Sequence, residues 1–117
     1  MRYDLLLKVD QRRANLAAKT ILLLELNKDD RRTRVGINSL LRRYFELLLQ
    51  VDFLREQEAV DANILRHWRS GMQADLRQIM EMRPSLKDQL EQLAKTHRQL
   101  PEFTASLLSD YLSHQSS

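Results

Sequence analysis

The sequence contains no cysteine and only two glycines and two prolines. The lack of cysteine excludes a disulfide scaffold, a thiolate metal site and a cysteine nucleophile. A β-sandwich or an α/β fold of 117 residues would need many more turn-forming residues. The abundant residues, Leu, Arg, Gln, Glu and Ala, favour helices. We therefore predict an all-α fold, a single-domain bundle of four to five helices over residues 1–117, with a frayed tail at 113–117.

Long apolar runs are also absent. The longest unbroken aliphatic run, from Ile21 to Leu24, is far shorter than the roughly 20 residues of a membrane-spanning helix. Near the N-terminus, Asp4 and Asp10 surround a short apolar patch, and no small-residue cleavage site of a signal peptide follows. These features lead us to expect a cytoplasmic protein with no membrane partner.

The most apolar and most periodic stretch runs from Ile37 to Leu54. Spacings of three and four place one set of its residues on a single helical face: Ile37, Leu40, Leu41, Tyr44, Leu47, Leu48, Val51 and Leu54. A second set, Phe45, Leu49 and Phe53, widens that face. So wide an apolar surface indicates burial on more than one side. We predict a central helix contacted by two or more others; the alternative is a leucine-rich recognition face for a partner.

Four further helices are predicted around this one. The first runs from about Tyr3 to Leu26. Its apolar stripe is formed by Leu6, Val9, Leu16, Ile21 with either Leu22 or Leu23, and Leu26. The stripe is interrupted by the polar residues 11–13. The lapse indicates a bend or an exposed middle. The central helix begins near Asp30, with Asp29 or Asp30 as its cap. We expect it to continue through Gly36; the alternative is a new start at Asn38 or Ser39, which are both good caps. The others follow as a stripe from Val60 to Met80, a helix after Pro84, and a short helix after Pro101.

Three local features carry more specific predictions. Trp68, the only tryptophan, lies in the middle of a stripe, so we expect it to be buried with its indole N–H hydrogen-bonded. Gly71, one helical turn after Trp68, has no side chain and so allows a neighbouring segment to approach the backbone closely. Ser85 with Asp88 resembles a capping box.

The sequence contains no catalytic or cofactor motif. The imidazoles His67, His97 and His114 have no histidine at i, i+4, and no Glu-x-x-His motif is present. Neither a Gly-rich phosphate loop nor a nucleophile elbow occurs. We therefore predict a protein that is not an enzyme and has no cofactor and no metal site.

Positive charge gathers in the first part of the chain. Residues 1–43 carry eleven Lys and Arg against five Asp and Glu, whereas residues 44–117 carry eight against eleven. The candidate anion- or partner-binding residues, here called the arginine edge, are Arg31, Arg32, Arg34, Arg42 and Arg43, with Arg12 and Arg13 as further candidates. Arginine suits contacts to phosphate or carboxylate. The alternative is a solvated edge that pairs with acidic residues of neighbouring helices.

The order of features between Asp30 and Leu90 resembles a known family. These features are Asp30-Arg31-Arg32, then Leu40-Leu41 through Leu47-Leu48-Leu49, then Trp68, then Pro84-Ser85-Leu86-Lys87. Over about half of the chain, this order is similar to the small helical bacterial family catalogued as domain of unknown function 29. The resemblance implies an all-helical fold and implies nothing about activity or site residues.

Two functions are consistent with these observations. The first is a small, non-catalytic helical protein-interaction module, an adaptor, inhibitor or assembly subunit, whose partner is another protein or a second copy in a homodimer. The alternative is a nucleic-acid-binding protein that uses the arginine edge.

Overall fold

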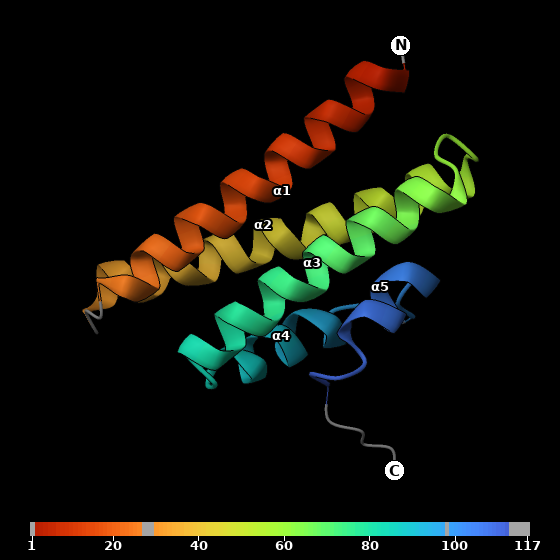
Figure 1. Ribbon diagram of the computed structural model, residues 1–117. Coiled ribbons are helices and arrows are strands. Elements are labelled where there is room, and N and C mark those ends of the chain that lie inside the picture. The colour runs from red at the N-terminus through yellow and green to blue at the C-terminus, as the bar shows by residue number, and fades with distance from the viewer. Residues whose placement is uncertain (1, 27–29, 98, 113–117) are drawn as a thin grey trace.

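The computed structural model describes residues 2–26, 30–97 and 99–112, and it is helical, with no strand in those ranges (Figure 1). Its five helices are α1 (Arg2–Glu25), α2 (Arg31–Glu56), α3 (Ala62–Met82), α4 (Leu86–Lys95) and α5 (Glu102–Leu108). The predicted all-α bundle is therefore confirmed. The tail predicted to fray, residues 113–117, lies outside the described residues, as do Asp29 and His114.

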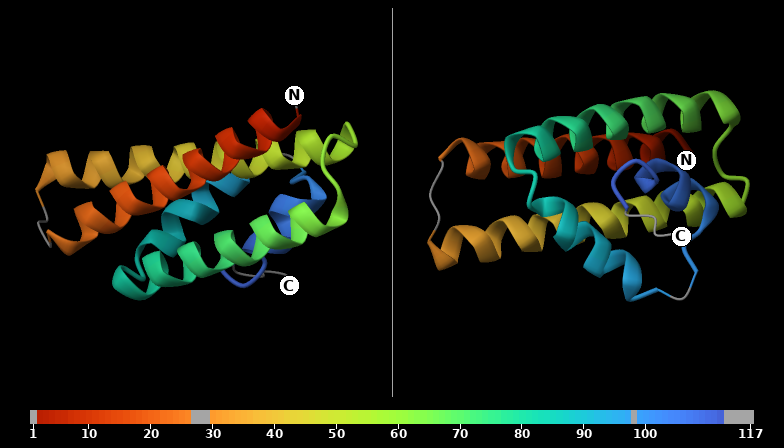
Figure 2. Two further views of the ribbon diagram at one scale, coloured as in Figure 1. Left: turned by 45° about the horizontal axis from the view of Figure 1, so that its top comes forward. Right: turned by 90° about the horizontal axis from the view of Figure 1, so that it is seen from below.

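Helix α2 lies at the centre of the bundle. Helices α1 and α3 run antiparallel to α2, and α1 packs along it (Figures 1 and 2). The shorter α4 crosses α2, and α5 contacts both α2 and α3 (Figure 2). Backbone contacts join α2 to α1, α4 and α5. The prediction of a central helix contacted by two or more others is confirmed.

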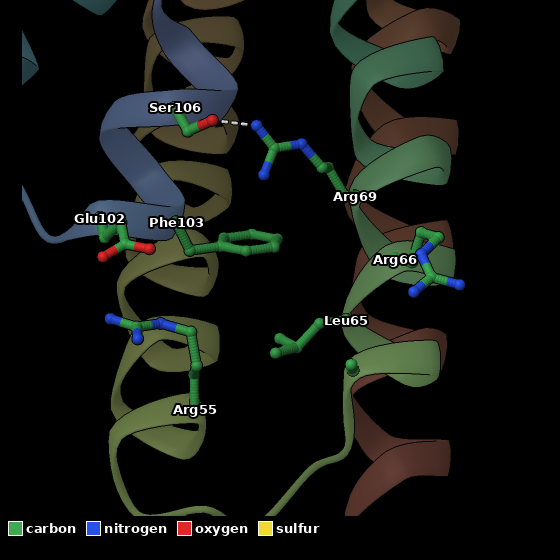
Figure 3. A pocket seen from close by; sticks show the side chains of 8 residues that line it. Arg55, Leu65, Arg66, Arg69, Glu102, Phe103 and Ser106 are labelled. Carbon is green, nitrogen blue, oxygen red and sulfur yellow. Dashed lines mark hydrogen bonds between the residues drawn. The ribbon is translucent and has the colours of Figure 1, made fainter.

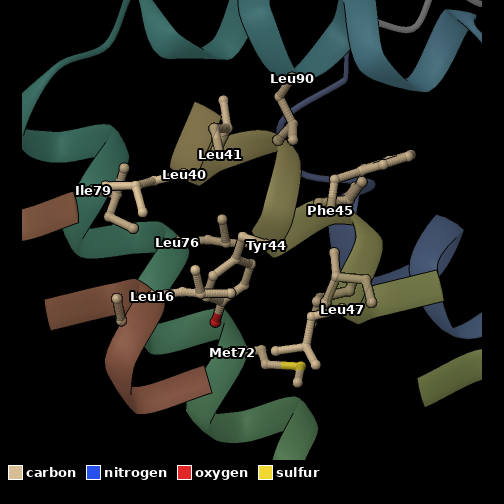
Figure 4. Close-up of a cluster of buried hydrophobic side chains, with 14 of the residues drawn as sticks. Leu16, Leu40, Leu41, Tyr44, Phe45, Leu47, Met72, Leu76, Ile79 and Leu90 are labelled. Atoms are coloured by element: carbon tan, nitrogen blue, oxygen red, sulfur yellow. The ribbon is translucent and has the colours of Figure 1, made fainter. Parts of the chain in front are cut away.

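The buried face of α2 carries most of the core. Its apolar residues Ile37, Leu40, Leu41, Tyr44, Phe45, Leu47, Leu48, Val51 and Leu54 are all buried. Figure 4 shows Tyr44 pointing from α2 into the core that also holds Leu16 of α1 and Leu76 of α3. One predicted member is wrong: Phe53 is 58% exposed. Neighbouring positions of a helix point about 100° apart, and α5 covers the side of α2 that carries Asp52, which leaves Phe53 in solvent.

Helix α1 uses a different stripe from the one predicted at its C-terminal end. Of the alternatives Leu22 and Leu23, Leu23 packs against the core and Leu22 is 59% exposed. Leu26 is 51% exposed, so its predicted place on the buried stripe is wrong. Thr20 and Leu24 are buried instead, since they continue the helical period from Leu16. The buried Thr20 hydroxyl donates to the Leu16 carbonyl at 2.7 Å, which satisfies it within the helix.

Helix α2 has well-defined signals at both ends. The Asp30 carboxylate accepts the Thr33 backbone N–H at 2.7 Å and caps the first turn. The helix continues through Gly36, where an added Cβ would lie 3.2 Å from Leu23 Cδ1 of α1, so glycine permits this close approach. At the other end Glu58 has a φ of 56°, and the N–H of Ala59 donates to the Leu54 carbonyl, as in a Schellman motif.

The predicted capping box of α4 is wrong. The Ser85 side chain makes no cap hydrogen bond. The backbone N–H groups of residues 86–88 donate instead to the carbonyls of residues 83–85 at 3.1–3.2 Å. Because this tight turn already satisfies the first amide groups of α4, they leave no donor for the serine hydroxyl.

Trp68 is buried as predicted, with 1% of its surface exposed. Its indole N–H, however, donates to no other residue in the described ranges, contrary to the prediction. None of the helices in those ranges is both long and apolar enough to span a bilayer.

Candidate functional site

The residues of the arginine edge are all exposed on α2, but they point to different sides of it. Arg34 lines a hollow of about 240 Å³ beside α4, together with Arg83 and Asp88. Arg43 lines a hollow of about 350 Å³ beside α1. The arginine edge is therefore not a single strip of charge but surrounds the solvent-facing arc of α2.

Between those two sides lies a surface that we call the outer face of α2, formed by Arg31, Arg32, Val35 and Arg42. Spacings of four and seven residues place Arg31, Val35 and Arg42 on one side of the helix. Arg32, three residues before Val35, lies at the edge of that side nearest Arg43. No acidic residue occurs from Arg31 to Phe45. None of Arg31, Arg32 and Arg42 forms an ion pair within the described ranges, and Val35 is 59% exposed. Cationic and apolar groups are thus both available to a ligand.

The hollow beside α1 brings a further candidate, Arg12, to Arg43. Lys19 also lines this hollow, and Glu46 contributes a carboxylate to it. The Arg12 guanidinium donates to Gln50 Oε1 at 2.7 Å, which holds it across the two helices. The structure therefore extends the positive surface from α2 onto α1.

Arg13, the other candidate, does not join this surface. Its Nη1 lies 2.9 Å from Asp75 Oδ2 of α3, and the Tyr44 hydroxyl donates to the same carboxylate oxygen at 2.8 Å. Burial and the neighbouring Asp75 carboxylate raise the pKa of Tyr44 above its ordinary value of 10.0. At the lapse in the α1 stripe, Gln11 and Arg12 are exposed, as one of the two interpretations predicted, whereas Arg13 is partly buried and links three helices.

Gly71 provides the space for this ion pair. An added Cβ at Gly71 would lie 3.2 Å from Arg13 Cζ and 3.2 Å from Arg13 Nη1. The predicted close approach at Gly71 is therefore made by the guanidinium of Arg13, which pairs with Asp75 one turn further along α3.

A larger pocket, here called the arginine pocket, lies between the C-terminal end of α2, the first half of α3, and α5 (Figure 3). Its volume is about 400 Å³, within the range of small-molecule sites. Its lining carries three guanidinium groups and one carboxylate, from Arg55, Arg66, Arg69 and Glu102. Leu65, Phe103 and Ser106 are among the residues that complete it. The sequence did not indicate this site, because its walls come from three separated segments and no spacing rule links them.

His67 and His97 are the two histidines in the described ranges, and neither belongs to a metal site there. His67 is exposed on α3, and the His97 ring lies 5.2 Å from the Phe45 ring, centroid to centroid, beside α4. Within the described ranges, no group of three or more His, Asp or Glu side chains is arranged to hold a metal ion.

No protein-family model, curated protein or solved structure matches the chain. The resemblance to the domain of unknown function 29 family stays a prediction and assigns no role to any residue.

Proposed function

We propose that the protein is a non-catalytic helical interaction module that binds an acidic protein surface through the outer face of α2. The observation that carries the proposal is the composition of that face: three arginines without an ion-pair partner in the described ranges, around the exposed Val35. Arginine together with exposed apolar surface is typical of protein interfaces. The long-range attraction of the arginines would speed association with an acidic partner.

The surroundings of the outer face support a protein partner over a nucleic acid. The end of the α1–α2 hairpin that carries this face extends beyond the turn between α3 and α4 in all three views, so it is accessible (Figures 1 and 2). Leu22 and Leu26, more than half exposed, lie at the same end of the hairpin on α1. Phosphate groups make no use of exposed leucine and valine, whereas a protein surface can cover them.

A photo-crosslinking amino acid at position 35 tests the proposal in a native lysate. We expect a nuclease-resistant adduct with a protein, and no such adduct from the same amino acid at the exposed position Ala74 of α3. The triple substitution Arg31→Glu, Arg32→Glu and Arg42→Glu should abolish the adduct. A matched control reverses the same number of charges at three exposed lysines elsewhere, Lys8, Lys87 and Lys95, and should retain it.

The nucleic-acid alternative gives a different result. Three arginines on phosphate would make log affinity for duplex DNA fall with log salt at a slope of about −2.7, from roughly −0.9 per contact. A duplex that stays bound at about 0.15 M salt and is lost in the arginine variant, but not in the lysine variant, would overturn the protein-partner proposal. A glutamate-rich peptide serves as the acidic probe in the same assay, and we expect the arginine variant to bind it at least tenfold more weakly than the lysine control.

A further inference from the structure

The arginine pocket contains a cation without a counter-ion. Arg69 is partly buried, and its guanidinium donates to the Ser106 hydroxyl of α5, 37 residues away along the chain (Figure 3). Arg69 forms no ion pair with any residue in the described ranges. Removing a guanidinium from water beside a neutral hydroxyl alone is unfavourable, because a hydroxyl offsets little of the lost hydration of a full charge. An anion beside Arg69 would correct this imbalance.

The other two arginines of the pocket are placed differently. Arg55 already pairs with Asp52 at 3.4 Å and with Glu56 at 3.9 Å, and Glu102 lies on the Arg55 side of the pocket (Figure 3). Arg66 donates to the Asn63 side chain at 3.2 Å. The carboxylates therefore gather at the Arg55 end, which leaves the Arg69 end as the part of the pocket that attracts an anion.

The Arg69 end supplies two kinds of donor. A guanidinium has five N–H groups in a planar fork, so Arg69 retains donors beyond the one used on Ser106. The Ser106 oxygen accepts from Arg69, which leaves its own O–H free to donate. An oxyanion in the pocket can thus receive hydrogen bonds from both side chains.

The remaining wall of the pocket is apolar. Figure 3 shows the Leu65 side chain from α3 and the Phe103 ring from α5 pointing into the space between the helices, below the Arg69–Ser106 contact. A ligand that fits this wall carries an apolar group next to its charge. An inorganic ion would leave the wall uncovered.

We propose that the arginine pocket binds a small organic anion, whose oxyanion is held by Arg69 and Ser106 and whose apolar part packs on Leu65 and Phe103. Phosphate and carboxylate heads share this chemistry. The site is separate from the outer face of α2, so either proposal can fail without the other.

Titration of the full chain, followed by amide chemical shifts, tests the proposal with four probes: phenyl phosphate, benzoate, inorganic phosphate and benzyl alcohol. We expect phenyl phosphate, benzoate or both to give saturable shifts at the amides of Leu65, Phe103 and Ser106, and which of them binds more tightly identifies the preferred head. Inorganic phosphate and benzyl alcohol should each bind at least tenfold more weakly. Equal binding of benzyl alcohol, or no saturable shift with either organic anion up to about 10 mM, overturns the proposal.

Substitutions assign the binding to the named residues. Arg69→Gln should weaken the organic anion at least tenfold, and Ser106→Ala should weaken it by a smaller factor. Arg77→Gln, which removes an exposed arginine from the same helix, is the control and should leave the affinity unchanged. Amide spectra that match the wild type away from the pocket establish that the variants are folded. Unchanged affinity in folded Arg69→Gln, or an equal loss in Arg77→Gln, contradicts the assignment.

Discussion

The Asp52 carboxylate of α2 accepts the backbone N–H of Thr104 at 2.8 Å, across 52 positions of the chain. The same carboxylate accepts the N–H of Phe103 at 2.9 Å and the Thr104 hydroxyl at 2.5 Å. Asp52 is 1% exposed, and the N-cap position of α5 is Pro101, which provides no side-chain cap. A residue of the central helix therefore performs the capping role that is usually local.

We predict that Asp52→Ala destabilises the protein by about 3 kcal/mol, because it leaves two buried backbone N–H groups without an acceptor. Chemical denaturation measures the loss, and amide exchange should accelerate most in α5. Asp110→Ala, at an exposed aspartate after the same helix, is the control and should change stability by less than about 0.5 kcal/mol. Equal stability of the two variants would mean that the Asp52 hydrogen bonds contribute nothing.

Gly71→Ala should change stability differently in the presence and in the absence of the Arg13 side chain. In a chain with Arg13→Ala, Gly71→Ala should stabilise by about 1 kcal/mol, the usual helix preference for alanine over glycine. With Arg13 present, the new methyl group meets the guanidinium at 3.2 Å and displaces it from Asp75, so the gain should shrink or reverse. A double-mutant cycle measures this coupling. Additive effects would mean that the Arg13 side chain moves aside at no cost.

Truncation of two apolar residues of α2, Leu48 and Phe53, should have very different effects on stability. Leu48 is fully buried, with 0% of its surface exposed, and Leu48→Ala should cost roughly 2–5 kcal/mol. Phe53→Ala, at a site 58% exposed, should cost less than about 0.5 kcal/mol. Melting temperatures compare the two. A large loss of stability in Phe53→Ala would show that another surface covers Phe53 in solution, for example in a homodimer.

Truncation in α3 gives an independent test of the core. Trp68 is 1% exposed, and Trp68→Ala should cost roughly 3–5 kcal/mol, the usual price of deleting a large buried ring. Chemical denaturation followed by circular dichroism measures it, since the variant loses the only tryptophan fluorophore. A variant that melts within about a degree of the wild type would place Trp68 at the surface.

The hydroxyl of Tyr44 should make stability depend on alkaline pH. Its pKa in the folded state is raised, first by burial and then by Asp75, so folding favours the neutral phenol. The corresponding stabilisation is complete below the unfolded-state pKa of about 10 and declines as the pH rises above it. Tyr44→Phe should therefore lose stability at neutral pH, by about 1 kcal/mol for the hydrogen bond to Asp75, and should show a shallower decline above pH 10. If the free energy of unfolding fell equally steeply with pH above pH 10 in the wild type and in Tyr44→Phe, the pH dependence would not come from Tyr44.

The elements of this fold could be predicted from the sequence because their signals are local. Helical spacing identified α2, and the short-range capping signal gave Asp29 or Asp30 as its cap. The cap is Asp30, whose carboxylate needs only the amide three residues later. The same spacing marked Phe53 as part of the core, since periodicity reports which residues share a face and not which helix covers that face.

The polar contacts between helices could not be predicted in this way. Arg13 reaches Asp75 across 62 positions and Arg69 reaches Ser106 across 37, and no local rule links such pairs. Before the helices were placed, Arg13 was indistinguishable from its exposed neighbour Arg12. For the candidate site, the arginines named from the sequence are exposed on α2, but the sequence did not indicate that Arg34 and Arg43 face different helices or that the arginine pocket exists.

The cap that Asp52 provides for α5 also bears on how the protein is made. A ribosome delivers the chain from its N-terminus, so α1 to α4 are released before residues 102–108. During that interval Asp52 lacks the three hydrogen bonds from Phe103 and Thr104 and keeps only its contact with Arg55 of the same helix, at 3.4 Å. A carboxylate with so few hydrogen-bond partners is disfavoured inside a core. The nascent bundle must therefore keep this side of α2 open to water, and it can close around Asp52 only after the last helix has emerged.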